Sequence, residues 1–186
     1  FSCLFYLLFI FGVWVAAEGA NCGGGEPATQ VVPWAGLPRI TRYVGVGVDY
    51  GTTNPTVAIL LGLGADGCWY AVDEWAHTPA TAGRKATDAE LSAGLRAWIT
   101  QPHTPGDAPD TLGRIYVDPA AASFREQLKR DGLATIPAAN DVVPGIQRVA
   151  SLLAAGRLKV SDRCKTLISE FPGYVWDTKA TDKGED

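Results

Sequence analysis

The sequence is short of several residue types, and each shortage narrows the possible functions. It has no methionine among 186 residues and begins at Phe1, so we expect a fragment or a processed form of a longer chain. The only histidines are His77 and His103, which lack partners at metal-ligand spacing, and we expect both in surface loops. The four cysteines form no C-x-x-C pair, which argues against a zinc site and a compact disulfide framework and favours reduced thiols.

An excess of positive charge is also missing. Sixteen basic side chains stand against 20 acidic ones, and the formal net charge of -4 argues against a protein that coats nucleic acid by bulk electrostatics. The basic groups gather late, because residues 125–165 hold eight of them against four acids. With 47% hydrophobic residues, the chain has the size and composition of one folded domain.

Residues 1–17 contain no charged side chain and are rich in Phe, Leu, Val and Ile. This run is at the lower limit of the roughly 17–25 residues of a membrane span, and no Lys or Arg precedes it as in a signal peptide. We expect a truncated or irregular segment, with secretion or membrane anchoring as the alternative. Because residues 23–38 are rich in Gly and Pro and indicate a linker, we divide the chain into residues 1–42 and a folded domain of residues 43–186.

The hydrophobic pattern of the folded domain predicts a mixed α/β sheet. β-branched and apolar runs indicate strands at 44–49, 56–63 and 68–74, with a hairpin turn at Asp66-Gly67. A capping box at Thr87 and Glu90 predicts a helix, a strand follows at 115–117, and Pro119 is expected to begin a second helix that ends near Arg130. A short strand at 133–136 and a helix from 140 or 141 to 153 complete the order β-β-β-α-β-α-β-α, which is that of the ribonuclease H-like architecture.

Two aspartates stand at the carboxyl ends of predicted strands, where ligands bind in open α/β sheets. Asp49 follows the run 44–48, and Asp118 follows the run 114–117. If these strands are neighbours, the carboxylates converge and provide the oxygen ligands that Mg²⁺ prefers, so we predict a metal site. Two metals about 3.5–4 Å apart would activate water and stabilise a leaving oxygen. Taken singly, Asp49 is equally explained as a turn residue and Asp118 as a helix cap.

Other charged residues are weaker candidates. Glu74, at the end of the third strand, is a possible additional metal ligand, although a solvated strand-end carboxylate is the commoner interpretation. A set of late basic residues is expected to contact DNA phosphates in a sequence-independent, salt-sensitive way, and solvated surface positions explain them nearly as well. This set is Arg125, Lys129, Arg130, Arg157 and Lys159.

Three segments together make the chain resemble the nuclease domain of the large terminase subunit of tailed bacteriophages. They are Tyr43-Val-Gly-Val-Gly-Val-Asp-Tyr-Gly-Thr-Thr-Asn-Pro-Thr56, Ile115-Tyr-Val-Asp-Pro119, and Gly145-Ile-Gln-Arg-Val-Ala-Ser-Leu-Leu153 with Gly156-Arg-Leu158. Trp14-Val-Ala-Ala-Glu-Gly19 is similar to the junction after the family's ATPase domain, although Val13 replaces the usual acid. The resemblance covers roughly residues 14–186.

The resemblance implies a ribonuclease H-like nuclease of a packaging motor that cuts concatemeric double-stranded DNA with Mg²⁺ or Mn²⁺ held by three acids. Asp49 matches the first acid and Asp118 the second. The third is expected in an Asp-rich helix beyond Lys183-Gly-Glu-Asp186, so we expect an incomplete site. The implied partners are the portal protein, the small terminase subunit and an ATPase domain of the same parent chain. The implied location is the cytoplasm of the infected bacterium.

One rival comes from the same strand. Val48-Asp-Tyr-Gly-Thr-Thr-Asn54 also resembles the phosphate-binding hairpin of actin-like ATPases and sugar kinases, which share the ribonuclease H-like core. Those proteins need a second Gly-rich loop, whereas Asp118 is followed by Pro-Ala-Ala-Ala-Ser. A non-catalytic, membrane-anchored binding domain is a third possibility, which rests only on residues 1–17.

Overall fold

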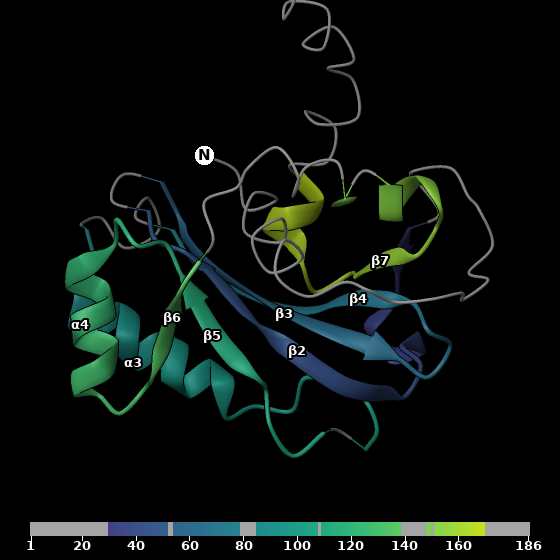
Figure 1. Ribbon diagram of the computed structural model, residues 1–186, viewed down its shortest axis with the longest axis horizontal. Helices are drawn as coiled ribbons and strands as arrows, with labels where there is room; N and C mark the ends of the chain where they lie inside the picture. The colour runs from purple at the N-terminus through teal and green to yellow at the C-terminus, as the bar shows by residue number, and fades with distance from the viewer. Residues whose placement is uncertain are drawn as a thin grey trace, which may run out of the picture.

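The centre of the molecule is a seven-stranded mixed sheet, shown in the ribbon view of Figure 1. The computed structural model describes residues 30–51, 54–78, 85–107, 109–138, 148–149 and 151–169. In chain order the strands are β1 (Val31–Val32), β2 (Ile40–Asp49), β3 (Thr56–Gly64), β4 (Trp69–His77), β5 (Arg114–Val117), β6 (Thr135–Pro137) and β7 (Leu158–Ser161). Across the sheet they lie in the order β1-β7-β4-β3-β2-β5-β6.

The strand directions confirm the predicted topology. β2, β3 and β4 form an antiparallel meander, whereas β5 pairs parallel to β2 and β6 pairs parallel to β5. Three antiparallel strands followed by βα units form the ribonuclease H-like arrangement. β7 and β1 extend this sheet beyond β4, since β7 pairs parallel to β4 and β1 parallel to β7.

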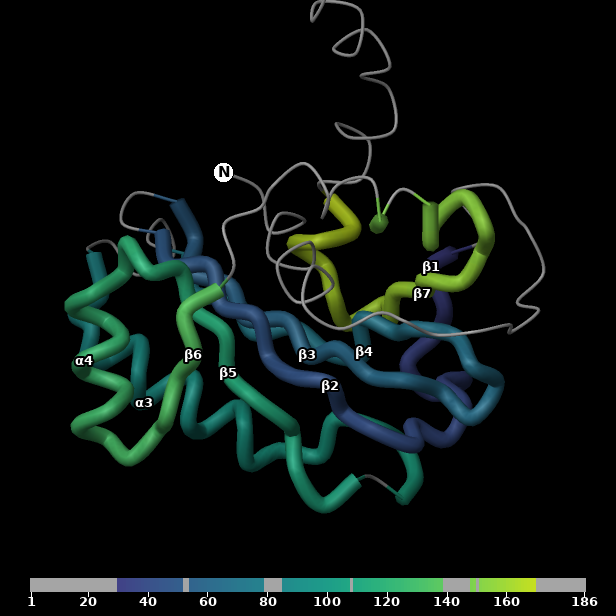
Figure 2. Tube along the Cα trace, viewed as in Figure 1, coloured from purple at the N-terminus to yellow at the C-terminus, as the bar shows by residue number. Residues whose placement is uncertain are grey.

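Helices cover both faces of the sheet. Figure 2 follows α3 (Asp88–Ile99) and α4 (Ala122–Arg130) along one face, while helix 165–169 lies over the other. Leu95 of α3 and Phe124 of α4 pack in one buried cluster with Val46 and Val48 of β2. Residues 148–149, 151–154 and 165–169 are helical, and their buried side chains belong to a second cluster with β3, β4 and β7. We call the side of this second cluster the open face.

Local sequence signals fix several element ends. Thr87 caps α3, because its hydroxyl accepts from the Glu90 amide while the Glu90 side chain accepts from the Thr87 amide. Gly67 completes the β3–β4 turn with φ 77°, and Gly132 follows α4 with φ 86°. Both positions lie in the left-handed region, which glycine adopts at little cost. The predicted hairpin, capping box and helix end are therefore confirmed.

The structure departs from the sequence prediction at three places. α4 begins at Ala122 rather than at Pro119, because residues 118–121 form a turn in which the Ala121 amide donates to the Asp118 carbonyl oxygen at 3.0 Å. β7 was not predicted, and β1 lies in the stretch interpreted as a linker. The start of the helix expected from residue 140 or 141 lies outside the described residues.

Cysteines and apolar segments complete the description of the chain. Cys164 is a free, buried thiol as expected, whereas Cys68 is disulfide-bonded, so the prediction of reduced thiols is wrong for Cys68.

Residues 1–17 and Lys183–Asp186 lie outside the described ranges. Within the ranges that the structure describes, we find no helix with the length and apolar character needed to cross a membrane.

Candidate active site

Asp49 and Asp118 lie side by side at one edge of the sheet. Val48 of β2 is paired with Val117 of β5 in a parallel register, and each aspartate is the next residue of its chain. Neighbouring strands are about 4.8 Å apart, so two aspartates that are 69 positions apart in the sequence are brought to one strand spacing of each other. Both aspartates are half-buried. The topology therefore brings together the two acids predicted to form the site.

The alternation of strand side chains places the two acids on the open face. Val57, the cross-strand partner of Asp49, and Tyr116, two residues before Asp118, both belong to the buried cluster of that face. Residues that are paired across strands or separated by two positions point to the same side of a sheet. The carboxylates consequently stand at the rim of an apolar layer, and α3 and α4 lie on the other side.

The donor chemistry of this pair fits a hard divalent cation. The Ala120 amide donates to Asp118 Oδ1 at 2.7 Å, so the turn role considered for Asp118 is present. A carboxylate offers about four lone-pair sites, which leaves acceptor capacity for a cation. Mg²⁺ is commonly held by one or two carboxylates together with substrate phosphates. Among the described residues, however, no group of three His, Cys, Asp or Glu side chains forms a complete ligand set.

Glu74 has a different environment from the aspartate pair. Its Oε1 accepts from the Thr166 amide and its Oε2 from the Leu167 amide, both at 2.8 Å, at the start of helix 165–169. Glu74 is half-buried, so the solvated strand-end position considered in its case is wrong. β4 is two strands away from β2, which separates Glu74 from Asp49 by about 10 Å across the sheet.

Comparison with known proteins finds phage large terminases among the relatives of this chain. The chain is 36% identical to the large terminase of a thermophilic bacteriophage, solved in complex with ADP, with a TM-score of 0.68 over 95% of this chain and 42% of that chain. It is 27% identical over 134 residues to the terminase large subunit of Escherichia phage T5, which is 71% of this chain and 27% of that protein. No family model matches the sequence.

The chain is a homologue of phage large terminases. The nuclease domain of the P22 large terminase, 17% identical, shares the fold with a TM-score of 0.57 over 85% of this chain and 80% of that domain. The ribonuclease H-like architecture is thus the one that a terminase nuclease domain uses. The chain spans less than half the length of the thermophilic-phage and T5 proteins.

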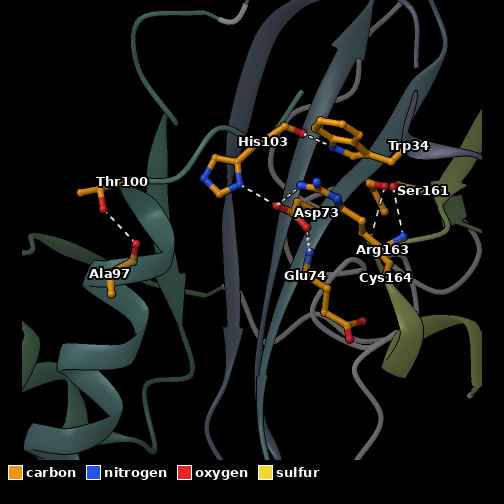
Figure 3. A network of polar contacts seen from close by, with 10 residues as sticks. Trp34, Asp73, Glu74, Ala97, Thr100, His103, Ser161, Arg163 and Cys164 are labelled. Atoms are coloured by element: carbon orange, nitrogen blue, oxygen red, sulfur yellow. Dashed lines mark hydrogen bonds and ion pairs between the residues drawn. The ribbon is translucent and has the colours of Figure 1, made fainter. Parts of the chain in front are cut away.

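His103 of this terminase homologue lies in a buried polar network rather than in a surface loop. Only 2% of it is exposed, and its Nδ1 is 2.9 Å from Asp73 Oδ2. Trp34 Nε1 donates to the His103 carbonyl oxygen at 2.8 Å. Figure 3 shows these side chains with Arg163, whose Nη1 lies 3.7 Å from Asp73 Oδ2. The surface prediction for His103 is therefore wrong, because residues 30 to 69 positions away in the sequence enclose it.

His77 is half-buried at the end of β4, not in a surface loop, and lines a pocket of about 190 Å³. Tyr50, Thr56 and Lys85 line the same pocket. The cross-strand partner of His77 is Thr56, and the next residue, Val57, points to the open face, so Thr56 points to the opposite face. The pocket is thus on the α3 side of the sheet, behind the aspartate pair in this terminase homologue.

The basic residues expected to bind DNA fall into two groups. Arg125, Lys129 and Arg130 lie on α4, which begins next to the aspartate edge. Arg157 and Lys159 lie where β7 begins, beside Trp69 at the start of β4. Ala76 is the residue of β4 that is in line with Asp49, because both are paired with Val57 of β3. Trp69 lies seven positions before Ala76, which corresponds to about 23 Å along β4. The α4 group is therefore the nearer one to the aspartates.

Local contacts also distinguish the two groups. Lys159 Nζ is 3.9 Å from Asp66 Oδ2 and 5.8 Å from the centre of the Tyr70 ring. On α4, Arg130 forms an exposed i,i+4 ion pair with Glu126 at 3.5 Å. Exposed pairs of this kind contribute at most about 1 kcal/mol, so they leave Arg130 able to exchange Glu126 for a phosphate.

Proposed function

We propose that this chain is the nuclease domain of a viral DNA-packaging large terminase subunit, a divalent-metal-dependent endonuclease that cuts concatemeric DNA. The observation that carries the proposal is the pairing of Asp49 and Asp118 at adjacent parallel strand ends, in a chain that is 36% identical to the thermophilic-phage large terminase. The shared fold of the P22 nuclease domain supports the same assignment.

Asp49 and Asp118 are the residues that would hold Mg²⁺ or Mn²⁺. When bound, such metals activate a water and stabilise the leaving 3′ oxygen of a phosphodiester. The chain itself supplies geometry: the β2–β5 pairing sets the spacing of the carboxylates, and the Ala120 amide orients Asp118. A third acid is expected downstream of residue 186, by resemblance to the family, so we expect the 186-residue chain alone to cut weakly.

The basic side chains of α4, on the other side of the sheet from the acids, would contact the DNA backbone where it passes the sheet edge at which α4 begins. Phosphate contacts of Lys and Arg position a duplex without selecting its sequence. In the parent chain we propose an ATPase domain, with the portal protein and the small terminase subunit as partners, in the cytoplasm of the infected bacterium. Glu74 is not included among the metal ligands that we propose, because both of its oxygens accept backbone hydrogen bonds.

Plasmid cleavage with Mn²⁺ or Mg²⁺ tests this function. Two proteins should be assayed: the 186-residue chain, and the longer parent chain that we propose contains it. Asp49→Asn and Asp118→Asn are each expected to slow cutting by about 10²-fold or more, because each tenfold loss corresponds to about 1.4 kcal/mol and a metal supplies several. Asp110→Asn, which removes an exposed charge from a loop, is the matched control and should cut at the wild-type rate.

Two results would contradict the assignment. The first is a longer chain that is inert with both metals. The second is cutting that Asp49→Asn and Asp118→Asn leave unchanged. ATP hydrolysis by the 186-residue chain alone would instead support the actin-like alternative.

A further inference from the structure

Two neighbouring acids on β4, Asp73 and Glu74, point to opposite faces of the sheet. β3 and β4 shift register here, since Leu60 is paired with Asp73 and Leu61 with Ala71, which leaves Val72 as an extra residue. Such a bulge re-aims the side chains beside it. Val72 packs in the α3-side cluster, and the Asp73 carboxylate reaches His103 from α3's side. Glu74 is paired with Ile59 of the other cluster and consequently faces the open face, and in Figure 3 its carboxylate points away from Asp73 and His103.

Asp73 holds the segment after β7 from the α3 side. Its Oδ2 contacts His103 Nδ1 at 2.9 Å and Arg163 Nη1 at 3.7 Å, and only 8% of its side chain is exposed. The Arg163 guanidinium lies over the Trp34 ring, with its Cζ 3.6 Å from the ring centre. A buried carboxylate is tolerated when a cation and a hydrogen-bond partner face it, as Arg163 and His103 do here. Asp73 thus ties Arg163 to the sheet.

Glu74 holds the same segment from the open face. Its two oxygens accept from the Thr166 and Leu167 amides, which belong to the first turn of helix 165–169. Amides in a first turn have no partner within their own helix, so a carboxylate from another element satisfies them. Cys164, between the two contact points, directs its Sγ toward the Ala71 carbonyl oxygen at 3.5 Å.

The clamped segment packs on the apolar layer beneath the aspartates. Cys164 and Leu167 are 0% exposed and share a cluster with Val57 and Tyr116. Val57 is the cross-strand partner of Asp49, and Tyr116 lies two residues before Asp118. A displacement of helix 165–169 would therefore be transmitted to the strand ends that carry the acids, because packed interiors transmit strain.

We propose that Asp73 and Glu74 are positioning residues of the nuclease site: from opposite faces of β4 they fix residues 161–169, and thereby the layer that supports Asp49 and Asp118. This inference rests on the nuclease function proposed above. It assigns Glu74 a role through the helix that it caps and not as a ligand of the metal.

Glu74→Ala and Glu74→Gln in the longer chain test the proposal through two measurements. Hydrogen exchange of the metal-free protein is expected to accelerate about tenfold or more at the Thr166 and Leu167 amides in Glu74→Ala. It should accelerate less in Glu74→Gln, which keeps one acceptor oxygen. Cutting at saturating Mn²⁺ is expected to fall about tenfold in Glu74→Ala, while the half-saturating Mn²⁺ concentration stays within about threefold.

Thr87→Ala is the control, because it removes the cap of α3 on the other side of the sheet. It is expected to lower stability, as the loss of a helix cap does, and to leave cutting within about twofold of wild type. Asp73→Asn, which weakens the hold on Arg163, should reduce the cutting rate in the same manner as Glu74→Ala.

Each other outcome overturns the proposal. If exchange at the Thr166 and Leu167 amides is unchanged in Glu74→Ala, Glu74 does not hold helix 165–169. If Thr87→Ala loses as much cutting as Glu74→Ala, the loss reflects general stability and not positioning of the site. A rise of tenfold or more in the Mn²⁺ requirement of Glu74→Ala would make Glu74 a ligand. An inert wild-type chain would refute the nuclease function itself. An active wild type whose Glu74→Ala variant cuts normally would refute only the positioning role, so the two failures can be distinguished.

Discussion

Ser92 and Asp131 join α3 to the end of α4 through one hydrogen bond between side chains. Ser92 is 0% exposed, and its hydroxyl donates to Asp131 Oδ2, which also accepts from Gln127 Nε2 at 3.1 Å. These bonds, the one from Ser92 first, lower the pKa of Asp131 below its ordinary value. A carboxyl with a lowered pKa stabilises the fold above the ordinary carboxyl pKa, near 4, and loses this contribution as the pH falls through the lowered pKa.

Ser92→Ala is therefore expected to raise the pKa of Asp131 toward its ordinary value. The loss of stability relative to wild type should be full at neutral pH and should shrink as the pH falls below about 4, where Asp131 becomes protonated in both proteins. An NMR titration of the Asp131 carboxyl and urea unfolding at several pH values measure both effects. Ser123→Ala, an exposed change on α4, is the control. An unchanged Asp131 pKa in Ser92→Ala would contradict the assignment.

Single residues differed in how far the sequence could predict them. Asp49 and Asp118 were accessible because each follows a recognisable strand, and parallel neighbours end at the same edge. His103 and Glu74 were not, since their environments depend on Asp73 and on the Thr166 and Leu167 amides, all at distances that no local spacing reveals. For Glu74 the sequence offered only an acid within an apolar strand run, and for His103 it offered a single histidine in a Pro-rich loop.

At the level of elements, the contact between β2 and β5 is unusually close at Gly45. A Cβ atom at this position would lie 2.6 Å from the Arg114 carbonyl oxygen and 2.9 Å from Tyr116 Cε2. The first of these is backbone of the neighbouring strand and cannot move aside without breaking the pairing. Gly45 therefore permits the strand contact that brings Asp49 to Asp118.

Gly45→Ala is expected to destabilise the protein by about 1–3 kcal/mol, the usual cost of overpacking. Because the strain falls between the two acid-bearing strands, metal-dependent cutting should decrease by more than the loss of folded protein explains. Urea unfolding and plasmid cleavage measure the two effects. Gly36→Ala is the matched control, since a Cβ there meets nothing within 4 Å. Equal stability of the two variants would show that β2 and β5 can separate without penalty.

Elements with repeated local signals were predicted well, and short ones were not. The meander β2–β4 and the helix α3 combine long apolar patterns with a turn or a cap. β1 has two residues and β7 has four, and each exists because it pairs with another strand far away in the sequence. The start of α4 moved because Asp118 uses its side chain and its carbonyl oxygen in a turn that precedes the helix.

For the molecule as a whole, the formal charge of -4 conceals a local asymmetry. The basic groups of α4 lie within about 12 Å of the helix start at the aspartate edge, whereas those beside β7 lie about 23 Å away along β4. DNA bound at the acids would contact the first group more readily than the second. The two groups can therefore be separated by experiment.

Lys129→Gln is expected to weaken DNA binding regardless of sequence and to reduce the slope of log affinity against log salt by about 0.9, the value for one phosphate contact. Lys159→Gln is the matched change at the distant group and should leave the slope unchanged. Fluorescence anisotropy of a labelled duplex over a salt series provides the measurement, without metal so that no cutting occurs. Equal effects of the two variants would mean that the duplex extends along the whole length of β4.

The outermost pair of strands constrains the order in which the chain can fold. Val31 of β1 is paired with Val160 of β7, and the Trp34 amide donates to Asp162 Oδ1 across 128 positions. On a ribosome, at roughly 5–20 residues per second, the partners of β1 emerge on the order of ten seconds after β1 itself. During that interval the outer edge of β4 is an unpaired strand edge, which is a template for aggregation. Slower synthesis between residues 32 and 160 would therefore lengthen the time for which this edge is exposed.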